Sequence, residues 1–178
     1  MTSVMEDQQE SGTWVTAMTR RRRIARIAIL VVEVGLVLWG AMAALLPEYL
    51  LGPGSTPILT AGYEGFTRGS WSQLAQTSPG TTAYITVLFR TYGAFNVAFG
   101  LAAIALTGPA FRRGDRWAWW GLLVGNTIAL GAAMTYDRTV NAIGPFELTE
   151  YLGLALVWGA LAVTAPFRAS GRPVPAIG

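Results

Sequence analysis

The chain contains no cysteine, no histidine and no lysine. These absences exclude a thiol nucleophile, a disulfide, a thiolate or imidazole metal site and a histidine-ligated haem. They also exclude a Ser-His-Asp triad and a lysine Schiff base. The available chemistry is that of carboxylate, tyrosine, hydroxyl, amide and arginine side chains, and no metal site is expected.

Charge is also scarce. Only 13% of the 178 residues are charged and 52% are hydrophobic, whereas an ordinary soluble domain has about 25% charged residues. The length predicts a single domain. The formal net charge of +3 does not indicate a nucleic-acid partner, because the arginines lie at the ends of apolar runs, where membrane topology explains them.

The chain does have four apolar runs of about the 20 residues that a membrane helix requires. They cover residues 24–46, 83–107, 117–136 and 146–165. We therefore predict an all-α membrane protein with a bundle of four transmembrane helices over residues 24–166. The first run, with its basic residues 20–23, is similar to a signal peptide, but its length and its internal Glu33 favour an uncleaved anchor.

Arginine placement predicts the orientation, because cytoplasmic loops carry an excess of basic residues. Both termini are expected in the cytoplasm, since the loops on the other side hold only Arg68 and Arg138, and Arg90 lies just inside the second run. The arginines on the cytoplasmic side are Arg20, Arg21, Arg22, Arg23, Arg26, Arg112, Arg113, Arg116, Arg168 and Arg172.

Three segments lie outside the runs. Residues 1–23 are expected to be a disordered cytoplasmic tail that ends in the basic run, and residues 167–178 a second tail. Residues 47–82 form a long external loop, of a length that is often functional. Within it, GSWSQLAQ predicts a short interfacial helix.

A rise of about 1.5 Å per residue assigns a depth to each polar group. Asn96 and Asn126 fall near the midplane, and Glu33 falls at the depth of Gly100. One external layer contains Arg90, Tyr136, Asp137, Glu147 and Glu150.

Two helix faces stand out. A polar face with small residues, suited to close helix contact or a narrow cavity, contains Arg90, Gly93, Asn96 and Gly100. A small-residue stripe on the third run, of the kind that lets membrane helices approach, contains Gly121, Gly125, Ala129, Ala132 and Tyr136.

Arg90 is expected to form an internal ion pair with Glu150 or Glu147. A lipid-facing arginine at this depth costs about 1–3 kcal/mol, which a carboxylate partner would offset. The alternatives are that its stem lies along lipid while its head reaches the interface, or that it binds an anionic or carbonyl-bearing ligand.

The acidic residues have structural and functional interpretations. Glu147 and Glu150 suit the start of a helix, whose dipole favours carboxylates, and they also suit an acid–base pair. Glu33 is expected to be protonated or hydrogen-bonded to Asn96 or Asn126. It either holds helices together or handles a proton or ligand.

The cluster RWAWW at residues 116–120 predicts an aromatic belt at the cytoplasmic interface; its alternative is contact with a pigment or quinone.

Taken together, the arginine-led first run ending in LLPE, the long external segment, the run FRTYGAFNVAFGLAAIAL and the acidic start of the last run resemble the DoxX-like proteins and similar small bacterial membrane proteins. The resemblance covers residues 20–166. It implies a four-helix bundle in the bacterial inner membrane and little about activity.

The main functional prediction is a non-catalytic protein, either an accessory subunit beside other membrane subunits or copies of itself, or a binder of a lipophilic molecule. No cofactor is predicted, and a bound lipid, quinone or pigment would fit. The alternative is an isomerase or cyclase, with Glu150 or Glu147 as acid and base and Arg90 holding an oxyanion. A second alternative is a transport or proton-handling protein using Glu33, Asn96 and Asn126.

Overall fold

The computed structural model describes residues 2–144 and 147–165, with side chains from Arg20 onward. In this part, the regular elements are helices, apart from an isolated β-bridge between Leu51 and Pro57, so the predicted all-α class is confirmed. The elements are α1 (Thr2–Leu45), the short 3-10 helix η1 (Pro53–Ser55), α2 (Ile58–Thr67), α3 (Trp71–Thr77), α4 (Pro79–Thr107), α5 (Pro109–Arg113), α6 (Arg116–Val140) and α7 (Leu148–Val163).

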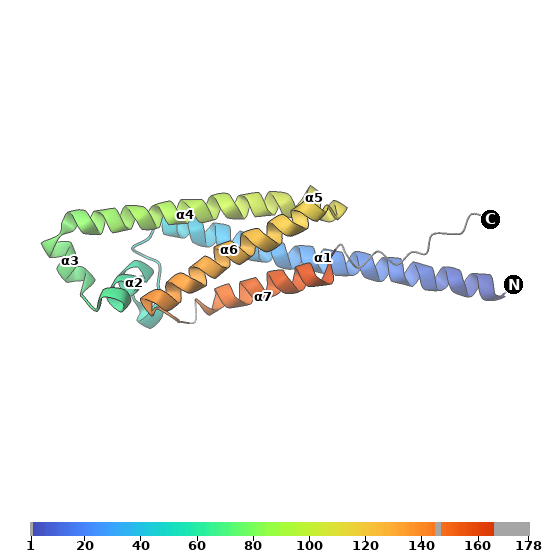
Figure 1. The fold of residues 1–178 in the computed structure, drawn as a ribbon, viewed down its shortest axis with the longest axis horizontal. Helices are drawn as coiled ribbons and strands as arrows, with labels where there is room; N and C mark the ends of the chain where they lie inside the picture. Colours follow the sequence, from blue (N-terminus) through green and yellow to red (C-terminus); the bar gives the residue numbers. More distant parts are fainter. Residues whose placement is uncertain (1, 145–146, 166–178) are drawn as a thin grey trace.

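Four long helices, α1, α4, α6 and α7, lie side by side and alternate in direction (Figure 1). Helix α1 packs against both α4 and α7, and α6 packs against α7 and more lightly against α4. Helices α2 and α3 lie together at one end of this group, and α5 lies toward the other (Figure 1). We call these the α2–α3 end and the α5 end.

Turn residues explain several helix boundaries. Pro79 and Pro109 stand in the first turns of α4 and α5, where proline loses no helical hydrogen bond. Helix α5 ends at Gly114 and α6 at Asn141, with φ angles of 82° and 54°. Glycine and asparagine adopt this left-handed conformation most readily.

Glycines allow α1 and α4 to approach each other closely. A Cβ atom on Gly40 would lie 2.7 Å from the carbonyl oxygen of Gly93, and one on Gly93 would lie 2.6 Å from that of Gly40. Gly100 lies against Val37 and the carbonyl oxygen of Glu33. The close helix contact predicted for the face of Arg90, Gly93, Asn96 and Gly100 is therefore found at Gly93 and Gly100, whereas Arg90 is half exposed. Glu33 and Gly100 lie at a common depth, as predicted.

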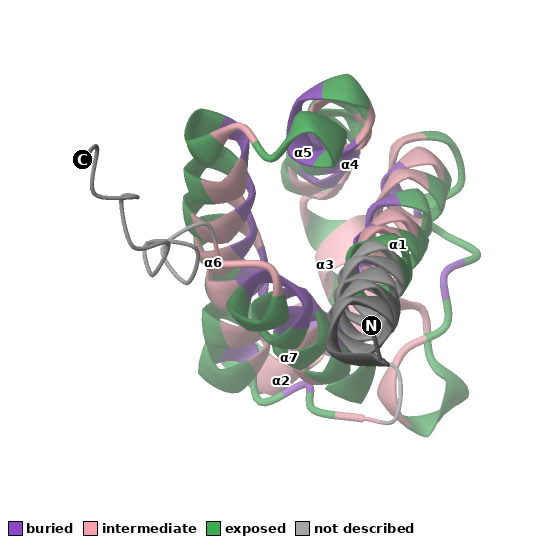
Figure 2. Ribbon diagram, turned by 90° about the vertical axis from the view of Figure 1, so that its right-hand side faces the viewer, coloured by how far each residue is buried: buried purple, intermediate pink, exposed green. Residues whose placement is uncertain are grey.

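The buried residues form two apolar clusters, one toward each end of the long helices. The cluster at the α5 end includes Ile29, Leu122 and Val157, and the cluster at the α2–α3 end includes Leu59 and Phe89. A view along the helices shows that buried residues face inward, whereas the outer faces are largely exposed (Figure 2).

Two helical segments, Arg20–Leu45 and Pro79–Arg113, are long and apolar enough to cross a membrane, and Leu148–Val163 is apolar but shorter. Helix α6 has 25 residues but is not in this set, because it is less apolar. Residue 146, where the fourth run was expected to start, lies outside the described residues, as does the expected tail at 167–178 with Arg168 and Arg172.

Two expectations about the connecting segments need correction. Helix α1 begins at Thr2, so the backbone is helical in the segment where a tail was expected. The segment 47–82 contains the predicted short helix, as α3, but also α2. Helix α2 packs against α6, where Gly62 leaves room for the hydroxyl of Tyr136, so the long loop is a folded cover at the α2–α3 end.

Candidate functional site

An apolar pocket of about 430 Å³ lies among α1, α4, α6 and α7. Its lining extends along α1 from Val31 to Met42, a length of about 16 Å at the rise of an α-helix. Leucine, valine and alanine side chains form most of the wall. The polar side chains in the lining are those of Tyr92, Asn96, Thr149 and Glu150, with the indole of Trp39 beside them.

The pocket opens sideways, between α1 and α7. Exposed side chains of both helices line it, among them Val31 and Leu38 of α1 and Leu152 of α7. Gly35 widens the opening, because a Cβ atom there would meet nothing within 4 Å. The opening is therefore bordered by apolar groups on the outer surface of the helix group.

Asp137 and Glu150 form a carboxyl pair at the end of the pocket nearest α2 and α3. The two carboxyl groups lie close enough to interact with each other. Among the described residues, no donor reaches the buried Oδ2 of Asp137 or Oε2 of Glu150. An ionised carboxylate only accepts hydrogen bonds, so a hydrogen bond between the two groups requires that they share a proton. Glu150 lines the pocket, and Asp137 lies outside the lining.

Glu147 lies beside this pair but has a structural partner. Its side chain is buried, and its Oε2 accepts a hydrogen bond of 2.7 Å from the backbone N–H of Gly144. It stands immediately before the first residue of α7, where a carboxylate is favoured by the helix dipole. Glu147 therefore holds the turn that leads into α7 and does not line the pocket.

The structure corrects the expected partner of Arg90. Its Nη2 donates to Oε1 of Glu48 over 3.2 Å, not to Glu150 or Glu147. Glu48 belongs to the turn after α1, and both side chains are about half exposed (48% and 53%). Exposed pairs of this kind contribute less than about 1 kcal/mol, so Arg90 does not hold the helices together strongly. Arg90 and Glu48 line a separate, more open hollow between α3 and α4, and neither lines the apolar pocket.

Glu33 has one of the two partners predicted for it. The Nδ2 of Asn126 donates to Oε1 of Glu33 over 2.8 Å and also to the carbonyl oxygen of Leu122 over 3.0 Å. Both Glu33 and Asn126 are completely buried. Glu33 Oε2 and Asn126 Oδ1 lack a partner among the described residues. A proton on Glu33 would let Oε2 donate to that amide oxygen and satisfy both atoms.

Asn96, the other predicted partner of Glu33, lines the pocket instead. Its Nδ2 donates to the carbonyl oxygen of Tyr92 over 3.0 Å, one turn earlier in α4. The ring of Tyr92 contacts the indole of Trp39 edge-on, with 5.5 Å between centroids. Both rings line the pocket near Glu150, so aromatic faces and carboxyl groups share one end of it.

Other predicted positions stabilise contacts between helices. Gly125 in the small-residue stripe of α6 faces Phe99 of α4, and Ala129 lines the pocket. Trp119 turns inward and donates from Nε1 to the carbonyl oxygen of Leu161, whereas Trp117 and Trp120 are exposed. The expected belt therefore has two outward-facing rings.

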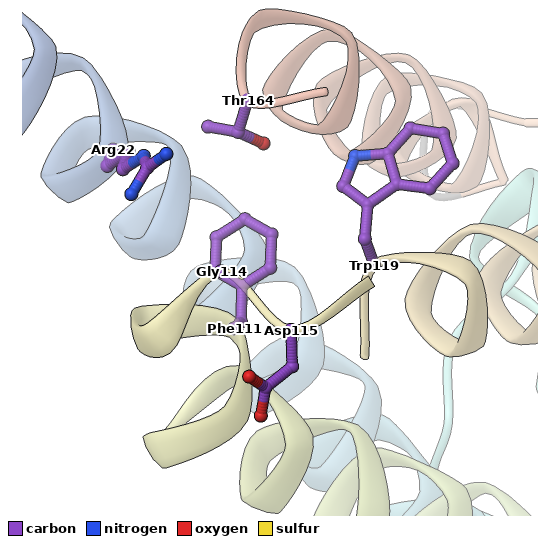
Figure 3. A pocket seen from close by; sticks show the side chains of 6 residues that line it. All are labelled: Arg22, Phe111, Gly114, Asp115, Trp119 and Thr164. Atoms are coloured by element: carbon purple, nitrogen blue, oxygen red, sulfur yellow. The ribbon is translucent and has the colours of Figure 1, made fainter. Parts of the chain in front are cut away.

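A second, much smaller pocket lies at the α5 end. Its lining combines Arg22 of α1, Phe111 of α5 and Trp119 of α6 with Gly114 and Asp115 of the α5–α6 turn and with Thr164, which follows α7 (Figure 3). Its volume of about 30 Å³ is room for one or two water molecules, not for a lipid or cofactor. Asp115 is held by Arg113 over 2.9 Å.

Sequence reasoning missed Trp39 and Tyr92, which line the pocket, and Glu48, which pairs with Arg90. Trp39 and Tyr92 are aromatic residues with a polar atom inside apolar runs, which is a usable signal. Glu48 had no such signal, because it lies in a segment that was expected to be loop. Within the described part of the chain, no group of three or more acidic, histidine or cysteine side chains is placed to hold a metal ion.

Comparison of the chain with protein-family models, with curated proteins and with solved structures finds no match.

Proposed function

We propose that this is an integral membrane protein whose four long helices cross a bacterial inner membrane with both termini in the cytoplasm, and that its pocket binds a lipophilic molecule from the bilayer. The resemblance to DoxX-like proteins supports the membrane bundle and says nothing of the ligand.

The outer surface of the long helices supports a membrane location. In the most apolar windows of the two long segments, only 22% and 33% of residues are buried, whereas a core helix of a soluble protein would be mostly buried. Water disfavours so extensive an exposed apolar surface, and lipid does not. The exposed apolar residues include Val31, Leu38, Phe95, Leu101, Ile128, Leu152 and Leu156.

The sideways pocket is the observation that carries the functional part of the proposal. Its volume falls within the range of about 300–1,000 Å³ that is usual for small-molecule sites. An apolar wall with a few convergent polar groups also fits such a site. A molecule dissolved in the bilayer would enter between α1 and α7 without passing through water, and Tyr92, Asn96 and Glu150 would orient its polar end.

The proposal favours a binder over an accessory subunit, because the middle of the small-residue stripe of α6 faces its own chain, with Gly125 against Phe99 and Ala129 in the pocket wall. A second candidate function is the isomerase or cyclase type, supported by the proton that Asp137 and Glu150 share at the pocket wall. Of the acid and base candidates, only Glu150 reaches the pocket, since Glu147 is bound to Gly144 and Arg90 to Glu48.

Native mass spectrometry of protein extracted from its own membrane in mild detergent tests the binding proposal. We expect the wild type to carry a lipophilic adduct and Gly35→Phe to lose it, because the new ring would occupy the pocket. Gly159→Phe is the matched control, since a Cβ atom on Gly159 would also meet nothing within 4 Å and Gly159 lies outside the pocket lining. An adduct that survives in Gly35→Phe, or its absence from the wild type, would contradict the proposal.

A further inference from the structure

We propose that the pocket selects a lipophilic cation, such as an amine or an onium ion with an apolar body, and that this cation binds in exchange for the proton shared by Asp137 and Glu150. The inference rests on the proposed binding function and names its ligand class. The cavity is the binding site, and the charges around its polar end determine which class of ligand it prefers.

Negative charge at this end of the pocket has no basic counterpart. The carboxyl groups of Asp137, Glu147 and Glu150 lie close enough to influence one another. The two nearest candidates for a counter-ion are engaged elsewhere: Arg90 pairs with Glu48, and Arg138 Nε donates to the hydroxyl of Tyr151 over 2.9 Å. No ion pair to Asp137 or Glu150 is present among the described residues.

The other groups that face this pair are neutral. Tyr92 of α4 and Tyr136 of α6 are its titratable neighbours besides Glu147. Helix α1 contributes apolar residues and Trp39 to this part of the pocket, and its one acidic residue in the described side chains, Glu33, is bound to Asn126. The buried indole N–H of Trp39 lacks a partner among the described residues and is the donor that an anionic head would meet, but the carboxyl groups would repel such a head and no basic side chain would offset that repulsion.

The aromatic rings of the pocket also favour a cation over a neutral or anionic head. Trp39 and Tyr92 line the pocket near Glu150, and Phe89 packs against both rings. A cation over an aromatic face is attracted to the negative face of the ring, and a nearby carboxylate attracts the same cation through its charge. A neutral head of the same shape gains neither of these attractions.

The exchange balances in charge. In the empty pocket, the shared proton joins the two carboxyl groups. When the cation enters, that proton leaves to water at the α2–α3 end, Glu150 faces the positive charge, and Asp137 adds its negative charge beside Glu150. Release of one proton per cation makes the apparent affinity rise by up to about tenfold per pH unit while the empty pair holds its proton.

Isothermal titration of the full-length protein in detergent, with tetraphenylphosphonium as the probe, tests the inference. Tetraphenylborate is a matched anion of nearly the same shape. We expect the cation to bind at least about tenfold more tightly than the anion, a difference of 1.4 kcal/mol. Titrations in two buffers with different protonation enthalpies should show one proton released per cation.

Single substitutions test whether Asp137 and Glu150 are the groups responsible for cation binding and proton release. We expect Glu150→Gln and, independently, Asp137→Asn to weaken cation binding at least about tenfold and to abolish proton release, and Glu48→Gln to leave both unchanged. Thermal unfolding of each variant confirms that it is folded. Equal binding of the two ions, or unchanged cation binding in both folded pocket variants, would overturn the inference.

A neutral probe, N-phenyl-1-naphthylamine, separates the two proposals. If it binds the wild type but not Gly35→Phe while the cation has no advantage, the pocket is a binding site and the choice of a cation is wrong. If neither the neutral probe nor the cation binds the wild type, both proposals fail.

Discussion

Glu33→Ala is expected to lower the free energy of unfolding by about 2–4 kcal/mol, whereas Glu33→Gln should lower it by less than about 1 kcal/mol. Alanine would leave a cavity in a completely buried position and remove an acceptor of the Asn126 amide. Glutamine keeps the volume, accepts the same hydrogen bond and offers its own N–H to Oδ1 of Asn126, which lacks a partner among the described residues.

Thermal unfolding in detergent measures this difference. For a chain of this size, 1 kcal/mol corresponds to about 2–4 °C in Tm. Thr139→Ala, an exposed substitution on the same helix as Asn126, serves as the control and should change little. If Glu33→Gln destabilises the protein as much as Glu33→Ala, the folded state requires an ionised Glu33, and a neutral Glu33 hydrogen-bonded to Asn126 is wrong.

Gly93→Ala is expected to destabilise the protein by about 2–3 kcal/mol or to prevent assembly of α1 and α4. The added methyl group would lie 2.5 Å from the backbone nitrogen of Ala44 and 2.6 Å from the carbonyl oxygen of Gly40. Both contacts are with backbone atoms, so no side-chain rotation relieves them, and the two helices have to separate.

The matched change is Gly131→Ala on α6, where a Cβ atom meets nothing within 4 Å. Because alanine favours the helix over glycine by about 1 kcal/mol, this variant should be unchanged or slightly more stable. Chemical unfolding of both variants in the same detergent gives the comparison. A similar loss in the two would show that the close approach of α1 and α4 is not what excludes a side chain at Gly93.

Counting depth along each run predicted much of the interior. It gave Asn126 as one of two candidate partners of Glu33, of which Asn126 is the one found, and it gave the level shared by Glu33 and Gly100. Both results follow from the nearly constant rise of long helices. It also brought Asp137, Glu147 and Glu150 together, since these residues lie at the same end of neighbouring helices.

The partner of Arg90 was beyond that method. Depth alone made Glu150 level with Arg90, but the direction of the guanidinium depends on the turn after α1, where Glu48 lies. The backbone of residues 46–49 forms this turn through a hydrogen bond from Tyr49 to Leu46, and nothing in a helical period describes it. The position of α2 was also beyond this method, because it depends on packing against α6.

The pocket was also outside the reach of the sequence. It exists because Gly35 and Gly153 carry no side chain where α1 and α7 border it, and because α4 and α6 make a lighter contact than α1 and α4. Both features depend on how the helices are spaced. Sequence reasoning did identify a lipophilic ligand as one possibility, from composition and from polar groups within apolar runs.

One measurement tests the central claim, a pocket that faces lipid and holds a lipophilic molecule, most directly. Because the chain has no cysteine, a single nitroxide label can be attached at Leu152→Cys, an exposed position at the opening of the pocket, and, as a control, at Gly159→Cys, in protein reconstituted into lipid vesicles. We predict that both labels collide with oxygen, which dissolves in lipid, far more often than with a water-soluble nickel complex, and that adding N-phenyl-1-naphthylamine shields only the label at residue 152. Frequent collisions of that label with the nickel complex, or equal shielding at both positions, would contradict the account.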